Sequence, residues 1–356
     1  MVSDKEKQVL SQENVMKDFP KVELHRHLEG TFSLETLYNI SKKNGLDTPN
    51  SFEEFKKAVQ FPKNGDPDFL LFLSKFRTDW YRSFDDVYQV VYNSVKDFKD
   101  DGLHYIELRF SPEHFSLQNN FNRLDITKLV VEAGNAAAAE IGVELTYLLT
   151  FNRSKQEEED MISLYKKLMN LALPEVVGID LAGDELNFPP EGFKRFFELV
   201  DSDGIPSTIH AGEVTPSSQI WTAIDTLHAN RIGHGTSAIN DPQLQTVLKD
   251  RGIALEQCIT SNYQTGSWVD EQNHPLGRLF KSGVPVTINS DDPFIQDTSL
   301  SDDYRKTVRY FDFGVEELKK ANHIAIDASF VSKERKLSLK NEFDRKVQAF
   351  VTKYAL

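Results

Sequence analysis

The chain has 356 residues, of which 39% are hydrophobic, and its formal net charge at pH 7 is −14. That length and composition suit an enzyme with a large core, while the negative charge argues against nucleic acid or an anionic membrane as a partner. Because Cys258 is the only cysteine, an intrachain disulfide and a cysteine-rich zinc site are excluded, and any metal is expected on histidines and carboxylates.

Residues 1–20 mix charges and contain no apolar run, so we expect neither a signal peptide nor a membrane anchor, and a cytoplasmic protein. Eight short apolar runs predict strands separated mostly by helical patterns. In chain order they span residues 22–28, 105–110, 144–151, 176–181, 207–210, 231–234, 253–258 and 284–289. Strands that alternate with helices form a parallel sheet, and eight such units predict an α/β fold of the TIM-like (β/α)8 barrel type across residues 1–356.

An extended helical insertion is predicted after the first strand, at residues 31–103. It contains a helical pattern from 84 to 98 that closes at Gly102, and the aromatic segment 69–76, FLLFLSKF. We predict that this segment forms a lid, and the alternative is that its apolar residues only pack the insertion onto the barrel. Within a C-terminal region at 305–356, residues 313–330 and 333–351 predict helices.

Four of the nine histidines fall at predicted C-terminal strand ends, where barrel enzymes hold their catalytic groups. His25 and His27 lie two residues apart on the first strand, so both side chains face the same way and can meet one metal. His210 ends the fifth strand, and His234 ends the sixth between two glycines. The remaining five are expected to be structural: His104, His114, His228, His274 and His323.

Carboxylates accompany these rim histidines. Glu213 lies where the chain turns after the fifth strand, and could be a ligand, a general acid/base or a solvated loop residue. Asp291 and Asp292 follow the eighth strand, and adjacent residues face different directions unless the chain bends, so two roles are expected; the alternative is a loop or cap doublet. Three imidazoles and one carboxylate suit Zn²⁺, which lowers the pKa of bound water to about 7. The fourth strand has no lysine to bridge two metals, so we predict one metal and metal-assisted hydrolysis.

Five segments in order along the chain resemble the adenosine deaminase family. They are PKVELHRHLEG at 20–30, DLAGDE at 180–185, HAGE at 210–213, RIGHG at 231–235 and SDDP at 290–293, with shorter similar segments at 109–112, 260–262, 265–268 and 274–275. The resemblance runs from about residue 19 to 304. It implies zinc-dependent hydrolytic deamination of adenosine, and of 2′-deoxyadenosine, to inosine and ammonia, with one Zn²⁺ per chain and a small purine nucleoside as the partner.

The resemblance also implies a role for each candidate residue. Glu213 would protonate purine N1, and His234 would orient the attacking water and stabilise its charge. Asp292 would hydrogen-bond N7, which needs one partner protonated, and the backbone N–H of Gly183 would meet N3. Segment 69–76, with Phe69 and Phe72, would cover the purine. The implied zinc ligands are His25, His27, His210 and Asp291.

Glu29 bears on the choice of substrate. Many adenosine deaminases carry Asp at this position, where its carboxylate reaches the ribose 5′-hydroxyl, whereas the similar adenine deaminases tend to have Glu. Gly233 and the segments 265–268 and 298–304 resemble the adenosine branch. We therefore favour adenosine over adenine. Two other classes are a nucleoside-binding barrel without catalysis, which the presence of every ligand and Glu213 disfavours, and a metal-dependent amidohydrolase acting on a cyclic amide.

Overall fold

Eight parallel strands form one sheet in which neighbours follow chain order. The computed structural model describes residues 2–62, 65–118 and 120–356. The strands are β1 (Lys21–His27), β2 (Leu103–Phe110), β3 (Glu144–Asn152), β4 (Val176–Ala182), β5 (Ser207–Ala211), β6 (Arg231–His234), β7 (Ala254–Gln257) and β8 (Val286–Ile288). The backbone N–H of His27 donates to Asp291 O and the N–H of Asp291 donates to His25 O, both at 3.0 Å, which joins β1 to the residues after β8. The predicted (β/α)8 barrel is confirmed.

All eight predicted strands are present, with small corrections at their ends. Leu28, which was expected in the first strand, lies in the 3₁₀ turn η1 (Leu28–Gly30). The eighth strand is shorter than predicted because the side chain of Asn289 accepts the N–H of Leu24 at 3.0 Å, in place of a backbone carbonyl. Cys258 lies outside β7 and precedes α13 (Ile259–Gln264).

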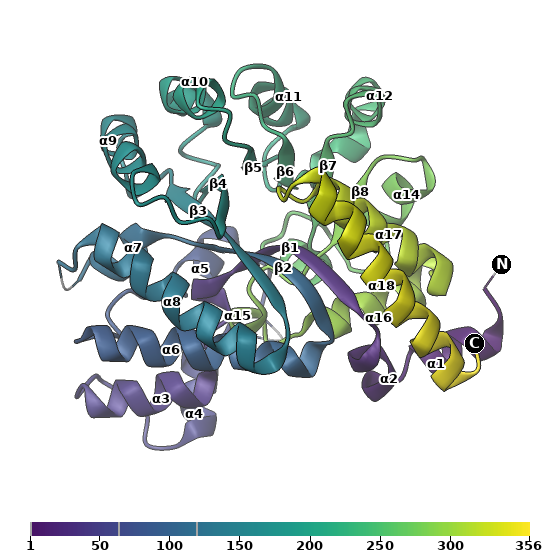
Figure 1. Cartoon of the computed structure of the whole chain (residues 1–356), viewed down its shortest axis with the longest axis horizontal. Helices are drawn as coiled ribbons and strands as arrows, with labels where there is room; N and C mark the ends of the chain where they lie inside the picture. The colour runs from purple at the N-terminus through teal and green to yellow at the C-terminus, as the bar shows by residue number, and fades with distance from the viewer. Residues whose placement is uncertain (1, 63–64, 119) are drawn as a thin grey trace.

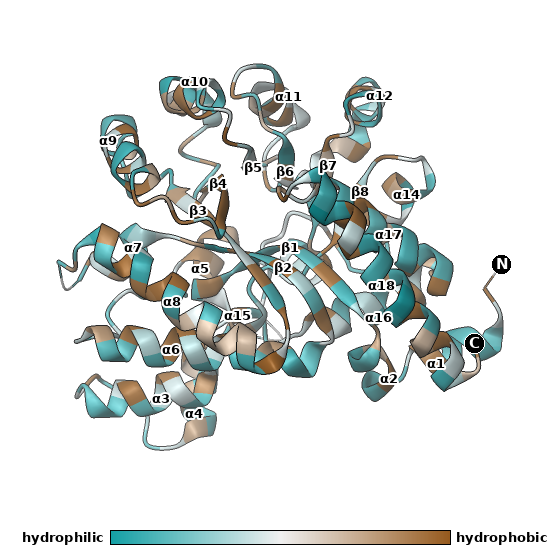
Figure 2. Ribbon diagram, in the orientation of Figure 1, coloured by the Kyte–Doolittle hydropathy of each residue, from teal (hydrophilic) through white to brown (hydrophobic). Residues whose placement is uncertain are grey.

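Helices surround the strands, as Figure 1 shows. After the insertion the chain forms α7 (Pro112–Ser116), α8 (Arg123–Ile141), α9 (Glu158–Met169), η3 (Pro190–Phe193), α10 (Lys194–Ser202), α11 (Ser217–Asp225), η4 (Thr236–Asn240), α12 (Pro242–Arg251), α14 (Leu276–Lys281) and α15 (Pro293–Gln296). The helices are amphipathic, so α18 (Lys333–Tyr354), the last helix of the chain, is largely hydrophilic in Figure 2, whereas β4 within the ring is hydrophobic. This pattern places the apolar core between strands and helices.

The chain ends are also helical. α1 (Asp4–Leu10) and α2 (Glu13–Asp18) precede β1, and α16 (Leu300–Phe311), α17 (Val315–Ala328) and α18 (Lys333–Tyr354) follow β8. The predicted helix 313–330 is shorter by two residues at each end, and the predicted helix 333–351 continues to Tyr354. The C-terminal helical region begins at Leu300 rather than at residue 305. No helix formed by the described residues combines the length and apolar character needed to cross a membrane.

Between η1 and β2, the described residues of the insertion form four helices and a 3₁₀ turn: α3 (Leu34–Lys43), α4 (Phe52–Val59), α5 (Phe69–Leu73), α6 (Phe84–Lys96) and η2 (Asp97–Asp101). α6 packs on α8 and on α3, and α4 packs on α3, which gives the stack at the lower left of Figure 1. Gly102 ends the 3₁₀ turn with φ 68°, as its position in the sequence suggests. The helical part of segment 69–76 stops at Leu73.

Three buried histidines that are not among the expected metal ligands predict how stability depends on pH. Burial lowers the pKa of His104 to about 4, and the pKa values of His114 and His274 to about 3. The unfolded chain, with histidine pKa values near 6.5, then binds more protons than the folded one, so stability is complete above about pH 6.5 and is lost as the pH falls toward these lower values. Each histidine contributes up to about 1.4 kcal/mol per pH unit in that range.

His114→Phe tests this dependence, because a phenyl ring suits the neighbouring Phe32 and Phe115 rings and cannot take up a proton. Urea unfolding between pH 7 and 5 should show a shallower loss of stability in this variant than in the wild type. His228→Asn is the control, since His228 is exposed and asparagine tolerates its φ of 58°. Equal slopes for His114→Phe and the wild type would contradict the prediction.

Candidate active site

A cavity of about 500 Å³ opens at the C-terminal ends of the strands. Apart from His25, every site residue predicted from the sequence lines it: His27, Glu29, Phe69, Phe72, Gly183, His210, Glu213, His234, Asp291 and Asp292. His25 is fully buried and meets the same group of side chains through its ring. The structure therefore brings all the predicted site residues together from six separate parts of the chain.

A compact histidine–aspartate cluster forms the floor of this cavity. The Nε2 atoms of His25 and His27 lie 3.2 and 3.4 Å from Asp291 Oδ1, and Nε2 of His27 lies 3.2 Å from Nε2 of His210. All four side chains are buried, and neither His25 Nε2 nor Asp291 Oδ1 has a hydrogen-bond partner among the described residues. Buried polar atoms without partners that converge on one point fit a metal ion.

The backbone bends sharply at Asp291, where φ is 64°. This bend resolves the question of how two adjacent carboxylates can serve one site. Asp291 turns toward the histidines and also accepts a 2.6 Å hydrogen bond from the Ser261 hydroxyl. Asp292 lines the cavity beside Gly30, where an added Cβ would lie 1.7 Å from its Oδ1, so only glycine fits there.

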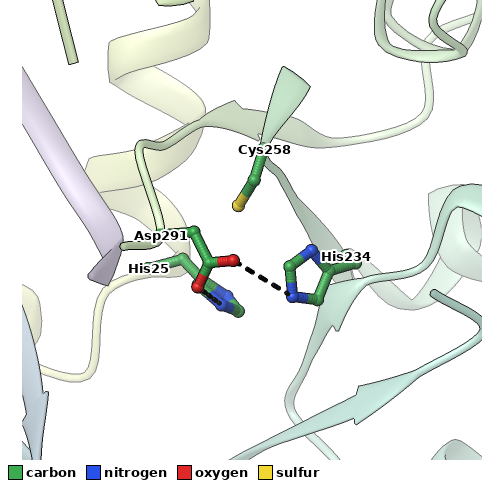
Figure 3. A group of neighbouring side chains, drawn as sticks. All are labelled: His25, His234, Cys258 and Asp291. Atoms are coloured by element: carbon green, nitrogen blue, oxygen red, sulfur yellow. Dashed lines mark ion pairs between the residues drawn. The ribbon is translucent and has the colours of Figure 1, made fainter. Parts of the chain in front are cut away.

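Cys258 lies closer to this cluster than the sequence suggested. Its sulfur belongs to a group with His25, His234 and Asp291 in which the potential ligand atoms are all within 4.8 Å of one another, and Figure 3 shows Asp291 between the two histidines. The thiol is thus within reach of a metal at this cluster, and the expectation that any metal binds histidines and carboxylates stays a prediction. Burial and the nearby Asp291 raise the pKa of the thiol well above its ordinary value, however, and metals bind the thiolate.

Two carboxylates that were not predicted to have a role contact His25 and His210. Glu256 Oε2 lies 2.7 Å from His25 Nδ1, and Asp180 Oδ1 lies 3.1 Å from His210 Nδ1. Arg109 donates to both carboxylates, at 2.8 and 3.1 Å. Burial is the largest single influence and raises the pKa of both acids, but Arg109, together with His210 at Asp180 and with Arg231 and His25 at Glu256, lowers both pKa values below their usual range. The ionised carboxylates fix each imidazole with its other nitrogen toward the cavity.

This charged network continues down the barrel. Arg231 donates to Glu256 Oε1 and to Glu107 Oε2, both at 2.6 Å, and all three side chains are fully buried. A buried charge is tolerated only when it is paired. Charged residues in the middle of otherwise apolar strands were therefore the feature of the sequence that indicated a buried network of ion pairs.

Glu213 is a buried acid next to the cluster. Its Oε2 lies 3.7 Å from His234 Nε2, and its backbone carbonyl accepts a 2.9 Å hydrogen bond from the Thr236 hydroxyl. Burial, followed by the negative charges of Glu185 and Asp291, raises its pKa well above the ordinary glutamate value. The raised pKa favours the protonated form of Glu213, in which the carboxyl group can donate a proton.

His234 ends β6 in a left-handed conformation, with φ 57°, and Gly235 follows with φ 65°. Backbone strain of this kind is concentrated at functional sites. These two left-handed residues direct the His234 ring into the barrel, where its Nε2 lies 3.9 Å from Asp291 Oδ2. On its other side, Nδ1 lies 3.0 Å from the Asn262 side-chain nitrogen. Burial and the nearby His25 lower the pKa of His234 well below its usual value, so the ring is neutral.

The outer wall of the cavity combines polar and aromatic groups. Glu29 Oε1 accepts the backbone N–H of Ser111 at 2.6 Å, and burial raises the pKa of Glu29 to about 8. Gly183 has φ 102°, and an added Cβ would meet the Asn152 side chain at 2.7 Å. Phe69 and Phe72 are both buried and line the same cavity. The cavity can thus hold a flat, partly polar molecule beside the histidine–aspartate cluster.

A parallel eight-stranded barrel with such a cluster and a buried acid at its C-terminal end defines a hydrolase of the metal-dependent barrel class. A model of the adenosine deaminase family matches residues 20–346. An adenosine deaminase of Clostridium acetobutylicum is 34% identical over 337 residues, which covers 92% of this chain and 98% of that protein. The chain therefore belongs to the adenosine deaminase family, as its motifs predicted.

Solved structures agree with this assignment. The crystal structure of an adenine deaminase from Arthrobacter aurescens aligns with a TM-score of 0.84 at 26% identity, covering 92% of this chain and 99% of that one. A zinc-bound amidohydrolase from Burkholderia ambifaria aligns with a TM-score of 0.87 at 21% identity, covering 100% and 96%. The latter likeness concerns the fold alone.

Proposed function

We propose that the protein is a zinc-dependent adenosine deaminase that converts adenosine and 2′-deoxyadenosine to inosine and ammonia, with one Zn²⁺ per chain. The observation that carries this proposal is the convergence of three imidazoles and Asp291 beside the buried acid Glu213, whose pKa is raised. His25, His27, His210 and Asp291 would hold the metal. When bound, zinc supplies an activated water at neutral pH by lowering the pKa of that water to about 7.

The protein's own side chains would carry the proton movements. Glu213 donates its proton to purine N1 while water adds at C6 and returns one proton to the Glu213 carboxylate. The second proton of the water passes to the amino group, and the C–N bond then breaks to release ammonia as the C6 carbonyl forms. His234 donates a hydrogen bond to the developing oxygen charge. Burial and the neighbouring Asp291 raise the pKa of Asp292 well above its usual value, which favours the protonated form that can donate to N7.

The remaining wall residues would position the nucleoside. The backbone N–H of Gly183 would meet N3, and Glu29 would bind the ribose. Phe69 and Phe72 would cover the purine and exclude water, with the helical insertion 31–103 acting as the lid of a single barrel domain. Exclusion of water strengthens every hydrogen bond between the site and the substrate.

Parallel initial-rate measurements on adenosine and adenine test the substrate. We expect kcat/KM for adenosine to exceed that for adenine by at least about 100-fold, because binding energy from the ribose is used in the transition state. Glu29→Ala should lower the ratio of the two kcat/KM values about tenfold, through the loss of a buried hydrogen bond. Glu29→Gln is the matched control, since it keeps an uncharged hydrogen-bonding side chain.

Other outcomes would select the alternatives. Faster turnover of adenine, which the presence of Glu29 favours, would make the protein an adenine deaminase. Binding of nucleosides by zinc-loaded protein without any release of ammonia would instead indicate a barrel that has lost catalysis.

A further inference from the structure

A hydrogen-bonded row of side chains leads from the back of His234 to the outer barrel. The Asn262 side-chain nitrogen lies 3.0 Å from His234 Nδ1, and Asn262 Oδ1 lies 3.0 Å from His274 Nε2. At the far end, the backbone N–H of Leu276 donates to His274 Nδ1 at 3.2 Å. The side chains of His234, Asn262 and His274 are all buried. From the sequence, His274 was expected to be structural.

The backbone N–H of Leu276 gives this row a single direction. A backbone N–H can only donate, so His274 Nδ1 must accept. Burial lowers the pKa of His274 to about 3, so the ring is neutral and carries its one proton on Nε2. That proton is donated to Asn262 Oδ1, which leaves the Asn262 N–H to donate to His234 Nδ1. If the hydrogen bonds ran in the opposite direction, His274 would carry its proton on Nδ1, and two N–H donors would face each other with no acceptor between them.

Three hydrogen bonds hold the backbone of Asn262 in place. Its backbone N–H donates to Cys258 O at 2.9 Å, and its carbonyl accepts from Trp268 N at 2.8 Å and from the Ser267 hydroxyl at 2.9 Å. These bonds fix the backbone of Asn262, and its buried side chain reaches both histidines from that fixed position.

We propose that His274 and Asn262 are positioning residues that fix His234 as the tautomer protonated on Nε2, the nitrogen facing Glu213 and Asp291. In this tautomer His234 serves the reaction as a hydrogen-bond donor and not as a base. The proposal rests on the proposed function for its catalytic consequence. The tautomer itself is a property of the protein without substrate.

Asn262→Asp reverses the direction of the row, because a carboxylate only accepts and would require the proton on His234 Nδ1. We expect kcat for adenosine to fall at least about tenfold with KM within about threefold and zinc content unchanged, the pattern of a lost transition-state interaction. His274→Phe, which removes the donor to Asn262, should lower kcat about threefold to tenfold. Asn230→Asp is the matched control, as it adds the same charge at the opposite end of β6.

Long-range ¹⁵N NMR spectra of the imidazole rings report which nitrogen of His234 carries the proton. If Asn262 and His274 had a structural role only, their substitution would not change this result. Wild-type protein should show His234 protonated on Nε2, and Asn262→Asp should move the proton to Nδ1. A wild-type His234 protonated on Nδ1, or unchanged kcat in a folded Asn262→Asp protein, would overturn the proposal. If Asn262→Asp does not fold, the wild-type spectrum and His274→Phe decide. Absence of adenosine turnover in wild-type protein with the expected tautomer would instead overturn the proposed function.

Discussion

Glu213→Gln should reduce kcat for adenosine by about 100-fold to 10,000-fold, the range that a general acid contributes. The amide of glutamine has nearly the shape of the protonated carboxyl group but cannot release a proton to N1. Glu213 lies beside His234 and outside the group of atoms that fits a metal, so zinc content should stay at the wild-type level. Steady-state kinetics and metal analysis of the same preparation check both parts.

Glu191→Gln is the control for this substitution. Glu191 is exposed in η3 and contacts Thr222, away from the cavity. It should leave kcat, KM and zinc content unchanged. Near-normal turnover by Glu213→Gln would remove Glu213 from proton transfer, and loss of zinc in that variant would make it a ligand.

The barrel and its rim could be predicted because they depend on local pattern. Alternating strands and helices fix a parallel barrel, and the C-terminal strand ends of a barrel meet at one end. His25 and His27 therefore had to lie near His210 once each was placed at a strand end. Asp291 joins them because its backbone pairs with β1 and closes the barrel, a contact between residues far apart in the chain.

The support beneath the site could not be predicted in the same way. Glu256 and Asp180 lie inside strands, where the sequence pattern indicates apolar core, and their ionised state depends on Arg109 from a third strand. The nearness of Cys258 to Asp291 likewise depends on how β7 and β8 align. The direction of the hydrogen bonds from His274 through Asn262 to His234 depends on the backbone N–H of Leu276, and a pattern of side chains in the sequence cannot predict where a backbone N–H points.

His25→Ala should abolish zinc binding at stoichiometric concentration and reduce turnover to the limit of detection. The substitution removes one of four converging donors together with the imidazole that contacts Glu256, and the site is then open on its inner side. Metal analysis after dialysis and the adenosine rate should fall together. His104→Ala is the matched control, since His104 is a buried histidine at the start of β2, remote from the cavity, and this variant should keep its zinc. Unchanged zinc in His25→Ala would exclude His25 as a ligand.

Two further substitutions separate the ligand from its neighbours. Glu256→Gln keeps the imidazole of His25 but replaces the ionised acceptor that orients it, so zinc affinity should fall about 10-fold to 100-fold rather than vanish. Cys258→Ser tests the other nearby donor. The protonated thiol predicted by its buried surroundings is not a ligand, so this variant should retain zinc at the wild-type affinity. A loss of zinc as large as that of His25→Ala would show instead that the metal draws the thiolate into its coordination and displaces one of the four expected ligands.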